Sequence, residues 1–363
     1  MGVQVHAIAD RRTQVAFSRF CSSFTVAGTP ASVYHAWLTW LLESAPKGSV
    51  VVPCDDDGLE IVARNRERLA AIGLRLGPAD HKVILEMLDK DRTLERAREL
   101  GVPAPRSARV RDGRELLAEA RALGLPSLLK PVHGHLFQRA SGLRAKALVI
   151  SDRGSLASAA ELVDRIGMEM SLAEIVPGPD DSLYFYWTYI DERGRAVFDL
   201  VERQLRQYPP GFGVASYRMT VEDAEIVGLG RRFVEGVGAR GLAQVELKRD
   251  ARDGVPRLLE CNHRLGAGAE LVRLAGIDVA RLVYSHAIGR PLTPPGRYRV
   301  GVRLWHFLDD VRAFRQLRQQ GALSVLEWSA SLCHRKRLSV FRLDDPMPTV
   351  GYLAARFVSR ARA

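Results

Sequence analysis

The sequence of 363 residues predicts a mixed fold with α/β and α+β parts. Three observations predict it. Strand and helix patterns alternate near the N terminus, antiparallel strand pairs mix with helices in the middle of the chain, and two alternating strands at 242–248 and 256–262 are joined by a turn at 249–254. The length is sufficient for two or three domains, each with its own core.

Residues 1–78 predict a small α/β domain with a parallel sheet. Strand patterns at 3–8 and 49–53 flank a helix at about 30–44, and a second helix at 59–72 follows. The acidic run at 55–57 stands between a strand and a helix, where aspartates typically cap the helix, although such a run is also compatible with a binding site.

Residues 79–290 predict a second domain of the α+β kind. The apolar periodicity of 80–100 predicts a helix that is broken near Asp89. A helix near 156–166 and another near 221–236 are expected among these strands, and 195–202 is expected to form a hairpin with 183–190. The remaining strands of this domain are expected at 127–131, 145–150 and 170–176.

Residues 291–363 predict a C-terminal segment that packs back on the body. The Pro-rich stretch 291–296 reads as a linker, and two amphipathic helices are expected around 305–317 and 323–332.

Composition argues against several classes of protein. No run of about 18 apolar residues is present, and the first residues lack the order of a signal peptide, so we expect no membrane span and a cytoplasmic location. The four cysteines show no C-x-x-C spacing, which argues against a zinc site or a disulfide framework. The net charge of +11 invites nucleic-acid binding, but the arginines are dispersed and the densest basic cluster, 334–337, is short, so nucleic acid is not favoured as a partner.

The strand pair carries the strongest chemical signal. Side chains alternate along a strand, so Glu260 and Asn262 share one face and Glu246 can lie opposite them. Two close carboxylates resist joint ionisation unless a cation neutralises them. Carboxylate and amide oxygens suit Mg²⁺, with Mn²⁺ as the alternative ion. A solvated acidic hairpin is the competing interpretation, and spacing alone leaves the choice open.

A phosphate site in this chain would have to use side-chain cations. The G-x-G-x-x-G pattern at 236–241 follows a helix and precedes a strand, the reverse of the order that dinucleotide binding requires, and no G-x-x-x-x-G-K-[ST] loop is present. The candidate cations, each typical of a surface residue when taken alone, are Lys90, Lys130, Lys146, Arg206 and Arg264.

Taken in chain order, these segments resemble the ATP-grasp superfamily, and within it the carboxylate–amine ligases related to D-aspartate ligase. The resemblance covers about residues 79–290. The matching motifs are Asp89-Lys90 with Gly101-Val-Pro-Ala-Pro105, Leu128-Leu-Lys-Pro131, Ala173-Glu-Ile-Val-Pro-Gly178, Arg206-Gln-Tyr-Pro209, Val245-Glu-Leu-Lys248, Leu259-Glu-Cys-Asn-His-Arg264 and Ala275-Gly-Ile-Asp278.

The resemblance implies two α+β subdomains that clasp ATP, a lid subdomain at about 103–175 and a truncated Rossmann-like N-terminal domain. It implies a nucleotide site in which lysines contact the phosphates, the backbone of a hinge strand meets adenine, and Asp181 meets the ribose, with Asp180 as the alternative. The lysines and the hinge residues are Lys90, Lys130, Lys146, Glu174, Ile175 and Val176.

The resemblance also implies the reaction. Glu246, Glu260 and Asn262 would bind magnesium, and Arg206 and Arg264 would face the γ-phosphate and an acyl phosphate. The expected enzyme joins a small-molecule carboxylate to an amine and releases ADP and phosphate, with a homodimer left open. One departure is Gln204, where relatives commonly carry Lys, and another is the glycine-poor stretch 131–142, where a loop would cover the triphosphate. The alternative is an ATP-binding protein of this fold without ligase activity, with a regulatory or polyanion-binding role.

Overall fold

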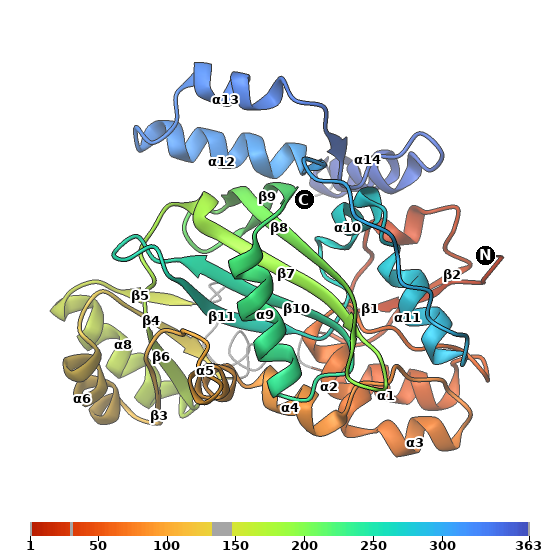
Figure 1. Ribbon diagram of the computed structural model, residues 1–363, viewed down its shortest axis with the longest axis horizontal. Coiled ribbons are helices and arrows are strands. Elements are labelled where there is room, and N and C mark those ends of the chain that lie inside the picture. The colour runs from red at the N-terminus through yellow and green to blue at the C-terminus, as the bar shows by residue number, and fades with distance from the viewer. Residues whose placement is uncertain (1, 30–31, 133–146, 362–363) are drawn as a thin grey trace.

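The computed structural model describes residues 2–29, 32–132 and 147–361. A large sheet occupies the centre of the molecule (Figure 1). A smaller sheet with two helices lies on one side of it, the N-terminal helices lie on the other, and C-terminal helices run along the top edge (Figure 1). The mixed architecture predicted from the sequence is therefore confirmed.

The N-terminal region is a small α/β unit whose strand pairing differs from the expected one. Its strands β1 (His6–Ala9) and β2 (Ser23–Val26) pair in parallel with each other. The expected strand at 49–53 is reduced to a single bridge between Val50 and Arg75, so the prediction that it completes this sheet was wrong. The helices of this region are α1 (Val33–Glu43), α2 (Asp56–Arg64) and α3 (Arg66–Ala71), after a short 3-10 helix at Gln14–Phe17.

The helix expected at 80–100 is two helices, as its acidic centre indicated. Helix α4 (His81–Leu88) ends at Asp89, and α5 (Lys90–Glu99) begins there. The Asp89 side chain accepts hydrogen bonds from the backbone N–H groups of Asp91 and Arg92, which caps α5. This cap places Lys90 in the first turn of a helix.

The smaller sheet has four antiparallel strands in the order β3-β6-β4-β5. Two helices pack on it around buried Leu116, Leu129, Val163 and Leu172. The elements are β3 (Ser107–Val110), β4 (Ser127–Pro131), β5 (Leu148–Ile150), β6 (Met170–Glu174), α6 (Gly113–Leu123) and α8 (Arg153–Ile166).

The large sheet has seven strands in the order β11-β10-β7-β8-β9-β12-β13. Its pairs are antiparallel except β12 with β13, which are parallel. The strands are β7 (Leu183–Ile190), β8 (Ala196–Tyr208), β9 (Val214–Val221), β10 (Gly241–Arg249), β11 (Pro256–Asn262), β12 (Arg303–Trp305) and β13 (Arg337–Leu338). A second 3-10 helix, Asp180–Ser182, precedes β7.

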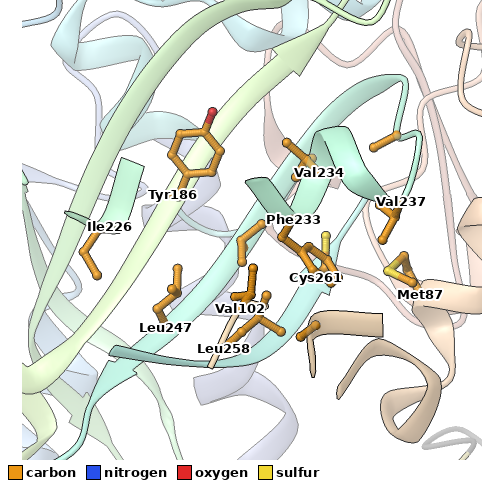
Figure 2. Close-up of a cluster of buried hydrophobic side chains, with 14 of the residues drawn as sticks. Met87, Val102, Tyr186, Ile226, Phe233, Val234, Val237, Leu247, Leu258 and Cys261 are labelled. Carbon is orange, nitrogen blue, oxygen red and sulfur yellow. The ribbon is translucent and has the colours of Figure 1, made fainter. Parts of the chain in front are cut away.

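The two faces of the large sheet have different partners. One face packs on α9 (Ala224–Gly236) and α5 in a hydrophobic core that includes Tyr186, Phe233 and Leu258 (Figure 2). Gly230 allows α9 to approach, because a Cβ there would come within 2.3 Å of the Tyr186 ring. Part of the opposite face is covered by α10 (Ala269–Ala275) and α11 (Val279–Ala287), and the rest lines a cleft.

The C-terminal segment contains both of the predicted amphipathic helices, α12 (Phe307–Gln319) and α13 (Val325–Leu332), and ends in α14 (Met347–Ala361). It also contributes β12 and β13 to the large sheet. The segment therefore packs back on the body, as expected. Among the described residues, no helix combines the length and the apolar character that crossing a membrane requires.

Candidate active site

A cleft of about 520 Å³ lies between the smaller sheet and the open part of the large sheet. The structure brings nine of the predicted site residues to its wall. These are Lys90, Lys130, Glu174, Ile175, Val176, Glu246, Glu260, Asn262 and Arg264. Lys146 lies outside the described residues, so its predicted phosphate contact stays a prediction.

The two glutamates of the β10–β11 hairpin lie directly opposite each other. Glu246 is the cross-strand partner of Glu260, and Gln244 is the partner of Asn262. Neither carboxylate receives a hydrogen bond in the part of the chain that the structure describes. Burial, and then the negative charge of Glu260, raise the pKa of Glu246 to about 7. Ionisation of Glu246 beside Glu260 is therefore unfavourable unless a cation lies close to the pair.

This donor set fits a hard divalent cation. Two facing carboxylates and the Asn262 amide oxygen are ligands that Mg²⁺ accepts, and the open cleft leaves room for further oxygen ligands. A group of three or more His, Cys, Asp or Glu side chains that could hold a metal does not occur among the described residues. A cation at this hairpin would therefore need the Asn262 amide oxygen as its third protein ligand.

Two lysines face the hairpin from the opposite wall. Lys130 lies on β4 of the smaller sheet, and Lys90 begins α5. Burial and the positive charge of Lys90 lower the pKa of Lys130, and the carboxylates of Glu260 and Glu246 oppose that shift. An anion placed between these lysines and the hairpin would stabilise both charged ammonium groups.

The hinge residues form another part of the wall. The Glu174 carboxylate is occupied by Arg252, at 2.6 Å, and this ion pair holds the pKa of Glu174 below its usual range against the effect of burial. The backbone of Ile175 and Val176 continues along the cleft, beside the apolar side chains of Leu128 and Leu183. The wall is therefore suited to a flat, weakly polar group.

The two aspartates considered for the ribose contact, Asp181 and Asp180, differ in where they lie. Asp180 lines the cleft, where it accepts hydrogen bonds from Gln207 Nε2 at 2.7 Å and from Gly211 N at 3.1 Å. Asp181 does not line the cleft and pairs with Arg203 at 2.8 Å. The short 3-10 helix turns the two neighbouring side chains in different directions.

Arg206 does not line the cleft, contrary to the expectation that it faces the phosphates. Its Nε and Nη2 donate to Asp310 at 2.8 and 3.0 Å, and its Nη1 donates to Ser331 at 2.9 Å. The pairing of β8 with β9 shifts register on both sides of Arg206, which breaks the alternation of faces. Arg206 therefore anchors the C-terminal helices, and the neighbouring Gln204 and Gln207 line the cleft.

Arg264 lies where the cleft meets the N-terminal region. It follows β11, lines the cleft, and donates from Nε to Asp56 at 2.5 Å. Asp55 caps α2 through a 2.8 Å hydrogen bond from Gly58 N, as the acidic run predicted. The run thus serves both as a helix cap and as the partner of a cleft arginine.

Several cleft residues escaped the sequence analysis. Alternation along β10 places Gln244 and Lys248 on the same face as Glu246, so that signal was present in the sequence. Arg218 also lines the cleft, but it lies on β9, a strand that the sequence analysis did not predict.

Comparisons with known proteins bear on this site. No protein-family model matches the chain. The D-aspartate ligase of Enterococcus faecium is 24% identical over 248 residues, which are 65% of this chain and 58% of that enzyme. The chain thus matches somewhat more than half of the length of that relative.

Solved structures share the fold. The biotin carboxylase domain of a Hydrogenobacter thermophilus 2-oxoglutarate carboxylase, in complex with MgADP, ADP and bicarbonate, covers 83% of this chain and 68% of its own, with a TM-score of 0.64 and 16% identity. The N5-carboxyaminoimidazole ribonucleotide synthetase of Thermus thermophilus covers 83% and 76%, with a TM-score of 0.61 and 16% identity. An L-amino acid ligase from Bacillus licheniformis covers 77% and 64%, with a TM-score of 0.56 and 17% identity.

Two observations confirm the predicted fold. Two sheets enclose the cleft, and solved structures of these enzymes have the same fold. The chain shares its fold with these enzymes and resembles D-aspartate ligase in sequence.

Proposed function

We propose that this protein is an ATP-dependent ligase that joins a carboxylate to an amine through an acyl phosphate. The observation that carries the proposal is the facing pair Glu246 and Glu260, with Lys130 on the opposite wall of one cleft. Carboxylates and cations that face each other across open space form a site for a metal-bound polyphosphate. The likeness to D-aspartate ligase and to an L-amino acid ligase supports this reaction class.

ATP would bind with its base against the hinge. The backbone of Glu174 to Val176 would meet adenine, Asp180 would meet the ribose, and Lys90 and Lys130 would contact the phosphates. Lys248 lines the same cleft beside Asp180 and supplies a further cation, although burial lowers its pKa. Glu246, Glu260 and Asn262 would hold magnesium, which when bound screens the charge of the phosphate oxygens.

The reaction would proceed in two displacements. An oxygen of the substrate carboxylate attacks the γ-phosphorus of ATP, the bond to the β–γ bridging oxygen breaks, and ADP leaves with that electron pair. The neutral amine then attacks the acyl carbon, phosphate leaves with the former carboxylate oxygen, and the amine proton passes to solvent. Positioning and charge neutralisation supply most of the catalysis, so no side-chain nucleophile is required.

Arg264 is the group we assign to the acyl phosphate. It lines the cleft next to Asn262, and its guanidinium provides several N–H donors in one plane. Its Nε donates to Asp56, which fixes the orientation of the fork and leaves the two terminal nitrogens for an anion.

The test is ADP release with magnesium and ATP over a matrix of carboxylates and amines, with Glu260→Gln as the blank. Release that requires one carboxylate and one amine together is the expected result. Binding of ATP without ADP release for any pair would overturn the proposal in favour of a protein without ligase activity. The comparisons give no support to that alternative. A cytoplasmic location and a homodimer stay predictions.

A further inference from the structure

Most of the positive charge of this protein lies in the last fifth of the chain. Residues 291–363 contain thirteen arginines and lysines and five acidic residues, so they supply eight of the eleven net positive charges. The helices of this segment run along the top edge of the molecule, where α13 is outermost and α12 lies between it and the large sheet (Figure 1). The charge is therefore concentrated in one layer of the fold.

The acidic residues of this layer are all engaged within the protein. Their partners are Arg312 for Asp309, Arg206 for Asp310, Ser324 for Glu327, Arg342 for Asp344 and Ser18 for Asp345. Exposed arginines are left over. Arg315 and Arg318 of α12 have no ion pair among the described residues, and the same holds for Arg335 and Arg337, which follow α13. Like charges three residues apart on a helix repel each other, so Arg315 and Arg318 favour an anion above them.

Apolar side chains are exposed beside these arginines. Helix α12 ends at Gln319 and α13 begins at Val325, so the two helices form a hairpin whose turn is 320–324. Val325 is 48% exposed and Leu326 is 81% exposed. We call Arg315, Arg318, the turn 320–324, Val325 and Leu326 the hairpin tip.

Leu326 has no role in holding the hairpin together. The two helices are joined by Trp328, whose ring stacks on Phe314 at 4.5 Å between centroids and whose Nε1 donates to Asp310 at 3.0 Å. Residues two apart on a helix point about 200° away from each other. Leu326 therefore points away from the side of α13 on which Trp328 packs, and it is directed outward.

This combination of side chains fits an anionic lipid surface better than it fits a nucleic acid. Proteins that bind nucleic-acid strands add to their basic residues aromatic rings on which bases stack. The rings of Phe314 and Trp328 stack on each other instead. At a membrane surface, basic side chains contact the lipid phosphates while leucine and valine enter the boundary of the acyl chains.

We propose that the hairpin tip binds anionic membrane surfaces, with Arg315 and Arg318 on the lipid phosphates and Val325 and Leu326 among the acyl chains. The partner is a lipid bilayer rich in acidic phospholipids. This binding does not depend on the proposed ligase activity, so either can fail without the other.

The test is sedimentation of the full chain with vesicles, at about 0.05 M and about 0.5 M NaCl. One set of vesicles contains phosphatidylcholine mixed with phosphatidylglycerol, and the other contains phosphatidylcholine alone. At the lower salt we expect binding to be at least about tenfold tighter to the anionic set, and we expect the higher salt to weaken it. Equal binding to both sets, or binding to neither, would overturn the proposal.

Two variants separate the charged from the apolar contribution. Arg315→Gln with Arg318→Gln should weaken binding to the anionic vesicles by at least about tenfold. Leu326→Ser should weaken it by at least about fivefold at both salt concentrations, because the apolar contribution is not screened. Unchanged binding in either variant would overturn the proposal.

The matched control removes two exposed arginines elsewhere. Arg68→Gln with Arg121→Gln changes α3 and α6, which lie away from the hairpin (Figure 1), and should keep binding within about twofold of the wild type. An equal loss in this control would show that net charge alone governs binding, and would overturn the assignment to the hairpin tip. Urea unfolding and the affinity for a non-hydrolysable ATP analogue should be unchanged in every variant, because the substituted side chains are exposed.

Two rival partners give different results with the same variants. Binding of duplex DNA as tight as binding of the anionic vesicles, weakened by the Arg315 and Arg318 changes but not by Leu326→Ser, would overturn the proposal in favour of a nucleic acid. Self-association without vesicle binding, seen by analytical ultracentrifugation and abolished by Leu326→Ser, would overturn it in favour of an interface between two copies of the chain.

Discussion

Two groups of carboxylates, one fully buried and one partly exposed, lie on the same face of the large sheet and differ in how their charge is balanced. Glu202 has hydrogen bonds from Trp187 and Arg218, so the protein itself completes its environment. Glu246 and Glu260 face each other without a hydrogen bond from the described residues, and burial raises the pKa of Glu246. The first group is balanced within the folded chain, whereas we propose that a cation balances the second. The comparison separates a structural ion pair from a ligand site on one surface.

The largest effect is a loss of turnover, which we expect from changes to the facing pair Glu246 and Glu260. Glu260→Gln should lower turnover by at least about 10³-fold, because the metal loses a charged ligand. In magnesium-free buffer the same variant should be at least as stable as the wild type, since one of two repelling carboxylates is gone. Initial rates and urea unfolding measure the two effects.

Glu225→Gln, which removes a carboxylate from α9, is the matched control for this experiment and should leave turnover unchanged. Loss of fold in Glu260→Gln, or turnover equal to that of the wild type, would contradict the assignment of the hairpin as a metal site.

At Glu202, whose charge Arg218 balances, we expect a loss of stability. Glu202→Gln leaves Arg218 buried without its counter-charge and should lower the free energy of unfolding by about 3–5 kcal/mol. Urea unfolding measures it. Adding Arg218→Gln to the same chain should recover a large part of the loss, because no buried charge then remains. A loss below about 1 kcal/mol in the single variant would mean that the ion pair is dispensable.

A smaller, pH-dependent effect is expected beside Arg218. Burial, and then the charge of Arg218, lower the pKa of His306 from 6.5 to about 4. Between these values the unfolded chain binds a proton that the folded chain does not, so stability is lost as the pH falls from 6.5 to 4. This group should contribute about 1–3 kcal/mol to that loss. Unfolding curves of wild type and His306→Gln at both pH values measure it, and parallel pH profiles would contradict the shift.

The smallest effect concerns the neighbouring aspartates, one at the cleft and one paired with the protein. Asp180→Asn should weaken nucleotide binding by about tenfold, whereas Asp181→Asn should change it by less than about twofold. Calorimetry with the ATP analogue measures both. The reverse order would restore Asp181 as the ribose contact.

Sequence patterns were sufficient for the hairpin and for much of the helix content. Alternation with period two identified the face shared by Glu260 and Asn262, and the acidic residues within an apolar repeat indicated the break between two helices at Asp89. Both signals are local, because they depend on residues within one element and its neighbour.

The failures were non-local. The register shifts that turn Arg206 towards Asp310 arise from the pairing of β8 with β9, and Asp310 is more than a hundred residues away in the chain. The strand β9, and with it Arg218, was not predicted. The spacing of residues within one segment does not reveal which distant residue a buried arginine pairs with. It also does not reveal where the register between two strands shifts.

The most direct test of the central claim is the fate of the carboxylate oxygen. With the substrate pair found in the matrix, the carboxylate is labelled with ¹⁸O and the released phosphate is analysed by mass spectrometry. An acyl phosphate transfers one labelled oxygen to each phosphate, so labelled phosphate formed in proportion to the amide is the predicted result. Amide formation with unlabelled phosphate would show that the carboxylate does not attack ATP at the γ-phosphorus, and would contradict the account.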